Sequence, residues 1–281
     1  MCGIFGWQLN KKETKDTKRF AVLSTLLMMK NEKRGGHSWG YYAPFKRKNR
    51  TVKGLGSITE GLDFSDLCEH SAVMAHTRWA SHGAVTVENA HPFEIGNVVG
   101  AHNGVISNHE DLNEIYGRKY PVDSQHIFSH LNEGLDMEDI HGYGAIEFVD
   151  KSKPGVFKLA KWNNGELAVY RIKTSKKGHD GIVWSSSHSH LSDALLIAGI
   201  GGDFIHLDPK TVYTIQNGEI YDTKTSLNFG ENTSSLRWDS NKIVSIPVKR
   251  KDDYWGKEDN HFEDAPLFDK YNHRVNLDTK Y

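Results

Sequence analysis

The sequence predicts an α+β fold in which helices cover β-sheets. The chain has 281 residues, of which 37% are hydrophobic, and this is enough for a sizeable buried core. Its first half mixes helical and strand patterns, whereas residues 144–222 carry mostly strand patterns separated by turns. Because each apolar sheet face needs a covering layer, sheets covered by helices fit both halves of the chain.

The elements of the first half follow from the spacing of apolar residues. Residues 2–9 form an apolar run with glycines, which is typical of a short buried strand. Residues 17–33 place Phe20, Leu23 and Leu27 on one face, which predicts a helix. Strands are further predicted at 39–45, 51–58, 71–78 and 97–106, and helices at 109–115 and 124–134, with Asn108 and either Asp123 or Ser124 as N-caps.

The second half is predicted to be rich in strands. Turn residues divide it, including Asn163-Asn164-Gly165 and the hairpin signal Gln216-Asn217-Gly218-Glu219. The expected strands are 144–149, 156–161, 166–172, 182–186, 203–207 and 211–222, with a short helix at 189–198. The composition changes after about residue 225, so we expect a domain over 2–225 and a C-terminal extension over 226–281 that is partly flexible or binds a partner.

Charge and composition exclude several classes of function. The formal net charge of −1 gives no footprint for direct nucleic-acid binding or for an anionic membrane surface. The longest apolar stretches, near 21–29 and 194–200, are far shorter than a membrane span of about 20 residues. Only two cysteines, Cys2 and Cys68, are present, and no secretory signal opens the chain. We therefore expect a cytoplasmic protein without a disulfide framework.

Cys2 is the first candidate for chemistry. If the initiator methionine is removed, Cys2 carries a thiol and a free α-amine on the same carbon. A thiolate is a strong nucleophile, and an α-amine titrates near ~8, so one residue then holds both a nucleophile and its base. A cysteine after the initiator methionine is not diagnostic alone, so the rest of the chain has to decide.

Polar clusters at predicted strand ends supply the other groups that such a nucleophile needs. Asn103 offers a side-chain amide and Gly104 an unobstructed N–H, which together suit an oxyanion. The Arg78 guanidinium can bind a carboxylate through two hydrogen bonds, and Asp123 can bind an ammonium group. Each also has a plain structural interpretation: Arg78 as an ion-pair partner, Asn103-Gly104 as a hairpin turn, and Asp123 as a helix cap.

Four stretches in register resemble one family. They are Met-Cys-Gly-Ile-Phe-Gly at 1–6, His-Thr-Arg-Trp-Ala-Ser-His-Gly at 76–83, Asn-Ala-His-Pro at 89–92 and His-Asn-Gly-Val-Ile-Ser-Asn at 102–108. Over roughly residues 2–222 the chain resembles a class II glutamine amidotransferase, and most of all the glutaminase half of glucosamine-6-phosphate synthase. The resemblance implies the four-layer αββα sandwich of N-terminal nucleophile hydrolases.

The resemblance also implies roles for individual residues. Cys2 would attack the side-chain amide of L-glutamine, with its own α-amine as base, and Asn103 and Gly104 would hold the oxyanion. Arg78 would bind the substrate carboxylate and Asp123 its ammonium group. Trp79, Ser81 and His82 would contact the substrate from the 78–83 loop that closes over the site. The family needs no cofactor and no metal for this reaction, and His76, His82, His91 and His102 match no compact zinc pattern.

The chain departs from the family pattern in places. His37 stands in the turn Arg34–Gly40 where relatives have an aspartate, Ser81 stands for threonine, and Gln125 stands for glutamate. The chain also has no room for an isomerase half. We therefore expect the ammonia to be passed to a separate synthetase or transferase that amidates a sugar phosphate or a nucleotide-type base, as in 7-deazaguanine pathways.

Two rival hypotheses remain open at this stage. One is an N-terminal nucleophile amidase that acts on another amide. The other is a regulatory subunit that has kept the fold without its activity. Intact Cys2, Asn103 and Gly104 argue against the second, and the opposite charges of Arg78 and Asp123 argue against the first.

Overall fold

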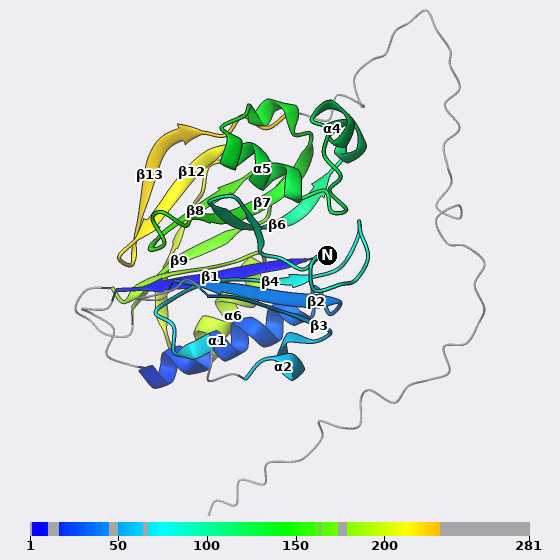
Figure 1. Ribbon diagram of the computed structural model, residues 1–281. Coiled ribbons are helices and arrows are strands. Elements are labelled where there is room, and N and C mark those ends of the chain that lie inside the picture. The colour runs from blue at the N-terminus through cyan, green and yellow to red at the C-terminus, as the bar shows by residue number, and fades with distance from the viewer. Residues whose placement is uncertain are drawn as a thin grey trace, which may run out of the picture. The chain divides into compact units, whose positions relative to one another are not determined.

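Two antiparallel β-sheets packed face to face form the centre of the structure (Figure 1). The computed structural model describes residues 2–10, 17–44, 50–63, 67–162, 164–173 and 179–230, all within the compact unit Met1–Ser235. A second unit, Leu236–Tyr281, lies outside the described residues. The prediction for the extension over 226–281 therefore falls almost entirely outside them as well.

In the described part of the chain, the first sheet has seven strands and the second has six. Sheet A contains, in spatial order, β11 (Gly201–Ile205), β9 (Ala168–Lys173), β10 (Gly181–Ser185), β1 (Gly3–Leu9), β4 (Ala72–Arg78), β2 (Ser38–Ala43) and β3 (Arg50–Leu55). Sheet B contains β13 (Glu219–Ser226), β12 (Thr211–Gln216), β8 (Val156–Lys161), β7 (Gly142–Asp150), β6 (Val98–Ile106) and β5 (Phe93–Ile95).

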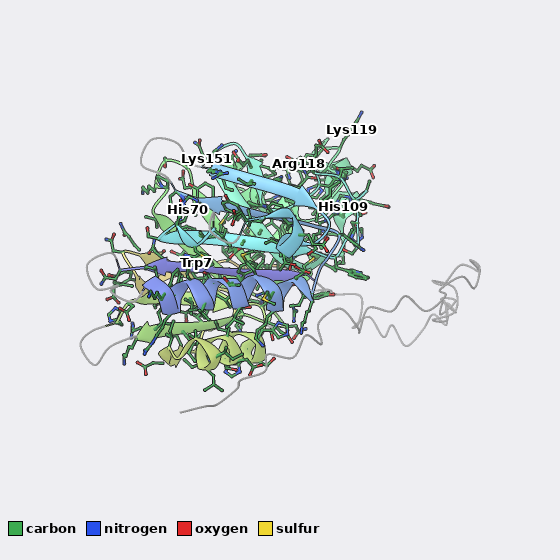
Figure 2. The ribbon with its side chains drawn as sticks, turned by 90° about the horizontal axis from the view of Figure 1, so that it is seen from below. Trp7, His70, His109, Arg118, Lys119 and Lys151 are labelled. Atoms are coloured by element: carbon green, nitrogen blue, oxygen red, sulfur yellow. The ribbon has the colours of Figure 1, made fainter. Side chains whose placement is uncertain are left out.

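Helices cover the outer face of each sheet. Beneath sheet A lie α1 (Thr17–Glu32), α6 (His188–Ala198) and the single turn α2 (Ile58–Gly61), and Figure 2 shows α1 and α6 side by side across the strands. Over sheet B lie α5 (Gln125–Glu133), α4 (His109–Ile115) and the 3₁₀ turn η1 (Met137–Asp139). The layers therefore run helix, sheet, sheet, helix, as the sequence predicts.

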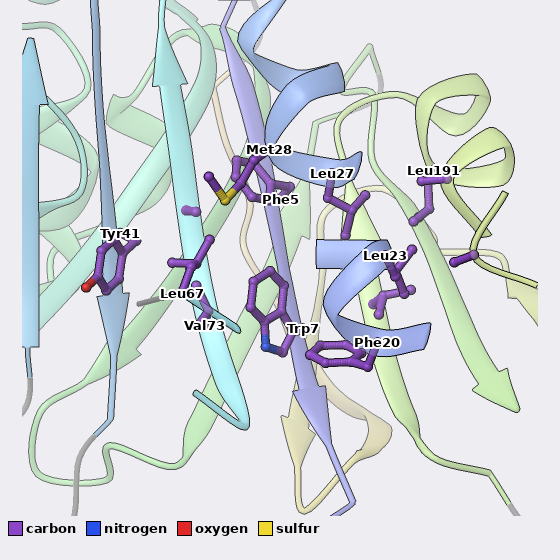
Figure 3. Close-up of a cluster of buried hydrophobic side chains, with 14 of the residues drawn as sticks. Phe5, Trp7, Phe20, Leu23, Leu27, Met28, Tyr41, Leu67, Val73 and Leu191 are labelled. Atoms are coloured by element: carbon purple, nitrogen blue, oxygen red, sulfur yellow. The ribbon is translucent and has the colours of Figure 1, made fainter. Parts of the chain in front are cut away.

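Alternation along the strands sorts side chains into the three layers of core. On β1, Phe5 and Trp7 face the helices, whereas Ile4 faces sheet B. On α1, Phe20, Leu23 and Leu27 point at these strands, and Figure 3 shows Phe20 against the indole of Trp7, with ring centroids 5.4 Å apart. The helical spacing of α1 and the two-residue spacing of β1 thus meet in one buried layer.

The third layer lies between sheet B and α5. Ile127 and Phe128 of α5 pack there with Ile106 and Val98 of β6. Phe229, just after β13, stacks on Trp162 with centroids 3.5 Å apart, so packing continues to the end of the described residues. Within the described residues, no helix is both long and apolar enough to cross a membrane.

Each predicted element of 2–222 has a counterpart, with ends shifted by a few residues. The prediction misses the short β5, α2 and η1. Asn108 and Ser124 occupy the predicted N-cap positions of α4 and α5, but neither side chain makes the capping hydrogen bond. Asn108 instead donates to Asp139 O and accepts from His141 N–H, so its side chain fixes the chain between η1 and β7.

Candidate active site

Cys2 immediately precedes β1, at one end of the space between the sheets. Alternation puts it on the same face as Ile4, which belongs to the intersheet core. Trp79 N–H donates to Cys2 Sγ over 3.3 Å, and Sγ lies 3.4 Å from Trp79 O. Arg34 Nε donates to the Cys2 carbonyl oxygen over 2.8 Å. The candidate nucleophile is therefore held at both its sulfur and its main chain.

The surroundings of Cys2 favour the protonated thiol. Burial raises the pKa of the Cys2 thiol above its ordinary value, and the Trp79 backbone hydrogen bond and the charge of Arg78 offset this only in part. The charge of Asp123 acts in the opposite sense to that of Arg78. A base has to take the proton before this sulfur can attack a substrate.

Asn103 and Gly104 lie on β6, in the sheet that faces Cys2. Asn103 shares its strand face with Ala101 and Val99 of the intersheet core, so its side chain points toward sheet A. Among the described residues its amide has no hydrogen-bond partner. Gly104 is paired with Gly144 of β7, and a Cβ on Gly104 would overlap the backbone oxygen of Tyr143.

A cavity of about 390 Å³ opens where these two strand ends meet, within the usual size range of small-molecule sites. Five predicted site residues line it. Its described lining is Cys2, Arg34, Trp79, Ser81, Asn103, Gly104, Val105, Tyr143, Gly144, Asn164 and Glu166. The cavity thus combines a thiol, a free amide and bare backbone.

Arg78 is buried beneath the loop that follows β4 and is not part of this lining. Its guanidinium donates to the backbone oxygens of Ala84 (3.2 Å), Gly83 (3.5 Å) and His82. These contacts fix the loop that the sequence predicts to close over the site. In the described structure the Arg78 guanidinium therefore already donates its hydrogen bonds to backbone oxygens of the protein.

Asp123 is also buried and lies outside the cavity lining. Its carboxylate accepts the Ile106 N–H over 2.7 Å and lies 4.0 Å from His82 Nδ1. His82 lines a separate hollow of about 250 Å³ that shares Val105 with the Cys2 cavity. Asp123 is thus placed beneath β6, close to the site, with protein partners of its own.

Three histidines of the motifs, His76, His91 and His102, form a buried connection between the sheets. His76 Nε2–H of β4 donates to His102 O of β6 over 3.2 Å, and the His76 ring lies 4.1 Å from that of His91. Burial lowers the pKa of His76 to about 3 and that of His91 well below its ordinary value. These rings are therefore neutral and structural, and no metal-ligand group of three or more is found among the described residues.

Sequence reasoning misses five polar or backbone groups of the cavity, one of which is Asn164, identified in the sequence only as a turn residue. Arg34 belongs to the turn Arg34–Gly40 of the family pattern, and its place in that motif could have indicated a role in the site. Tyr143, Gly144 and Glu166 carry no motif, because the sheet pairing that brings them together joins segments far apart in the sequence. Glu166 lies 3.6 Å from Arg34 as an ion pair at the mouth.

Comparison with known proteins decides the family. None of the known protein-family profiles matches the chain. The glutamine–fructose-6-phosphate aminotransferase (isomerizing) of Vibrio vulnificus is 35% identical over 229 residues, which cover 78% of this chain and 36% of the relative. The enzyme of the same name from Bordetella pertussis is 28% identical over 205 residues, covering 68% and 33%.

The chain belongs to the class II glutamine amidotransferase family. It spans about a third of the length of the curated relatives that it matches. The prediction of an amidotransferase family is therefore confirmed.

Solved amidotransferase structures confirm the fold. The glutamine phosphoribosylpyrophosphate amidotransferase from B. subtilis, complexed with ADP and GMP, superposes with a TM-score of 0.54 and 18% identity, over 81% of this amidotransferase and 50% of that chain. A structure described as the allosteric regulatory enzyme of purine biosynthesis gives the same values. At this identity the likeness concerns the fold alone, and it agrees with the αββα layers described above.

Proposed function

We propose that this amidotransferase hydrolyses L-glutamine to glutamate and ammonia through a thioester on Cys2. The observation that carries the proposal is the cavity that joins Cys2 to Asn103 and Gly104. In the proposed reaction the Cys2 thiolate adds to the side-chain amide carbon, and Asn103 and Gly104 donate to the oxyanion. The amide nitrogen takes up a proton and leaves as ammonia, and water then hydrolyses the thioester. One such donor is worth on the order of 3 kcal/mol, or about 100-fold in rate.

The proton of the thiol needs an acceptor, and two groups are candidates. Once Met1 is removed, the α-amine of Cys2 lies on the same residue as the sulfur, and it is the base that we propose. Among the described lining residues, Glu166 is the carboxylate that competes for this role, but it pairs with Arg34 at 3.6 Å and is largely exposed. A leucine inserted between Met1 and Cys2 would block the amine, whereas Glu166→Gln removes only the carboxylate.

The central test is glutamate release from glutamine by the purified chain. We expect Cys2→Ala to abolish it and Cys2→Ser to reduce it by several orders of magnitude. The leucine insertion should be inactive, and Glu166→Gln should retain activity within about threefold, as expected for an exposed ion pair. Labelling by 6-diazo-5-oxo-norleucine should fall on Cys2. Unchanged glutamate release by Cys2→Ala would refute the mechanism.

The proposal extends to the two ends of the substrate. Arg78 and Asp123 lie close enough to Cys2 for their charges to act on its thiol in opposite directions, which suits a substrate with both a carboxylate and an ammonium group. We propose that Arg78 binds the former and Asp123 the latter when the 78–83 loop, with Trp79, Ser81 and His82, rearranges around glutamine.

One observation favours a second candidate, an amidase acting on another amide. Both Arg78 and Asp123 have protein partners and neither lines the described cavity. Comparison of glutamine with simple acyl amides that lack the α-substituents separates the two functions. We expect a preference for glutamine of at least 100-fold, which Arg78→Lys should reduce. Equal rates on both substrates would favour the amidase.

We further propose that the ammonia passes to a separate synthetase docked over the cavity. Two exposed aromatic side chains line the cavity, Trp79 and Tyr143, with exposed fractions of 54% and 47%, and the loop after Trp79 also exposes Val85 and Val87. The names of the relatives favour a sugar-phosphate acceptor, and a nucleotide-type base is the alternative. Candidate synthetases should raise the rate of glutamine hydrolysis when added, and a partner with no effect on it would be excluded.

A further inference from the structure

The turn Arg34-Gly35-Gly36-His37 touches both sides of the Cys2 site. Arg34 holds the Cys2 carbonyl oxygen, and His37 N–H donates to Arg78 O over 3.0 Å. Gly35 is pressed against the peptide between Arg78 and Trp79, because a Cβ there would lie 2.7 Å from Trp79 N. The turn therefore fixes the start of β1 relative to the end of β4.

The side chain of His37 extends this contact onto the loop itself. Its imidazole stacks on the indole of Trp79, with ring centroids 4.4 Å apart and an interplanar angle of 27°. Its Nδ1 accepts the Ala80 N–H over 2.9 Å. The same Trp79 presents its backbone N–H and oxygen to Cys2 Sγ. His37 thus contacts both Trp79 and Ala80. The backbone of Trp79 is in turn in contact with the Cys2 thiol.

We propose that His37 is a positioning residue that keeps the Trp79 backbone against the Cys2 sulfur. The proposal rests on the function proposed above, in which that sulfur is the nucleophile. The aspartate of the family pattern could accept from Ala80 N–H but has no ring to stack on Trp79. In this chain one side chain supplies both the acceptor and the stacking surface.

The hydrogen bond from Ala80 N–H requires one protonation state of the His37 imidazole. Because Nδ1 accepts the Ala80 N–H, the imidazole has to be neutral with its proton on Nε2. A second proton would place an N–H against an N–H and break the contact.

Three substitutions separate the two contacts. His37→Asn keeps an acceptor but has no ring and does not titrate, His37→Phe keeps the ring without the acceptor, and His37→Ala removes both. The matched control is His206→Asn, since His206 is a strongly exposed histidine remote from the site in the sequence. The readouts are kcat/KM for glutamine from pH 5 to pH 8 and the rate of Cys2 alkylation by iodoacetamide, with Cys68 as an internal reference.

We expect His37→Phe to lose about tenfold in kcat/KM at pH 8, the value of one hydrogen bond of about 1.4 kcal/mol, and His37→Ala to lose at least as much. His37→Asn should stay within about threefold of the wild type at pH 8. If all three variants follow His206→Asn at every pH, the proposal is wrong.

A second measurement is independent of glutamine hydrolysis. Amide hydrogen exchange should become at least tenfold faster at Trp79 and Ala80 in His37→Phe and His37→Ala, with the core strands unchanged. If the wild type fails to hydrolyse glutamine, the proposed function fails, but faster exchange and altered Cys2 alkylation would still support the positioning role. Unchanged exchange with unchanged alkylation would overturn it even in an active enzyme.

Discussion

The two halves of the candidate site are held in place by different means. On sheet B, Gly104 and Gly144 approach so closely that a Cβ on either would overlap backbone, and His102 Nε2 lies beneath both. On sheet A, Cys2 and the Trp79 loop are held largely by side chains, namely Arg34, His37 and Arg78, beside one close backbone contact at Gly35. Backbone contact leaves no room for adjustment, whereas side-chain contacts can be weakened one at a time. The comparison therefore predicts abrupt effects on sheet B and graded effects on sheet A.

The largest effect is expected for Gly104→Ala. The new Cβ would overlap Tyr143 O and lie 2.5 Å from His102 Nε2, so β6 and β7 would have to separate at the cavity. We expect at least a 1000-fold loss of glutaminase activity or a loss of about 3 kcal/mol in the free energy of unfolding. Gly36→Ala is the matched control in the other half, because no heavy atom lies within 4 Å of its added Cβ. Similar losses in both variants would break the comparison.

Acid should loosen the connection between the halves. The pKa of His76 is lowered to about 3 and that of His91 also lies below its ordinary value, so the unfolded chain binds more protons below pH ~6.5. The free energy of unfolding is therefore highest above pH ~6.5 and falls as the pH decreases, by roughly 2 kcal/mol for each such histidine at pH 5. Urea unfolding at several pH values measures this slope. His91→Leu should reduce the slope by up to one proton, whatever its effect at pH 7.5, and an unchanged slope would contradict the assignment.

Replacement of Arg34 tests the sheet A half of the site, where graded effects on activity are expected. Arg34→Lys keeps the charge near Glu166 but loses the directed hydrogen bond to the Cys2 carbonyl oxygen. We expect kcat/KM for glutamine to fall by about tenfold, corresponding to about 1.4 kcal/mol, with little change in the melting temperature. Arg19→Lys, at an exposed hydrogen bond to Gly199 O, is a matched control. A complete loss of glutaminase activity in Arg34→Lys would show that the side-chain contacts on sheet A tolerate change no better than the contact between Gly104 and Gly144 on sheet B.

The smallest effect concerns a contact between the sheets away from the site. Glu147 of β7 is fully buried and accepts from Trp184 Nε1 of β10, and burial raises the pKa of this carboxyl well above its ordinary value. The folded chain then binds more protons than the unfolded one above pH ~4.3, so this group lowers stability as the pH rises. Glu147→Gln keeps the acceptor and should gain on the order of 1 kcal/mol at pH 8 relative to pH 5. A wild-type-to-variant difference that is equal at both pH values would exclude this role.

The sequence predicts the elements better than it predicts the contacts. The apolar spacing of 17–33 and of 2–9 is local information, and α1 and β1 appear where it indicates. The motif residues Cys2, Trp79, Ser81, Asn103 and Gly104 share one cavity, as their family resemblance implies. Cys2 and Asn103 face the same space because alternate residues of a strand point to the same side, and this alternation can be read from the sequence.

The rest depends on pairing that no local pattern encodes. Gly144 and Glu166 reach the cavity because β7 pairs with β6 and because the turn after β8 folds back over it. The departure at His37 is visible in the sequence, but its stacking on Trp79 is not. Arg78 and Asp123 lie near the site, yet their present partners are set by loop and helix packing.

The glycines of sheet B have a consequence for altering selectivity. Gly104 and Gly144 line one wall with main chain alone, and a Cβ on Gly165 would overlap Gly144 O directly behind it. These two positions offer no side chain to exchange, so their contribution to the shape of the cavity is common to every variant that folds. New substrate preferences, whether selected in nature or in the laboratory, would have to arise at side chains of the lining such as Arg34, Trp79 and Ser81, which can each be replaced.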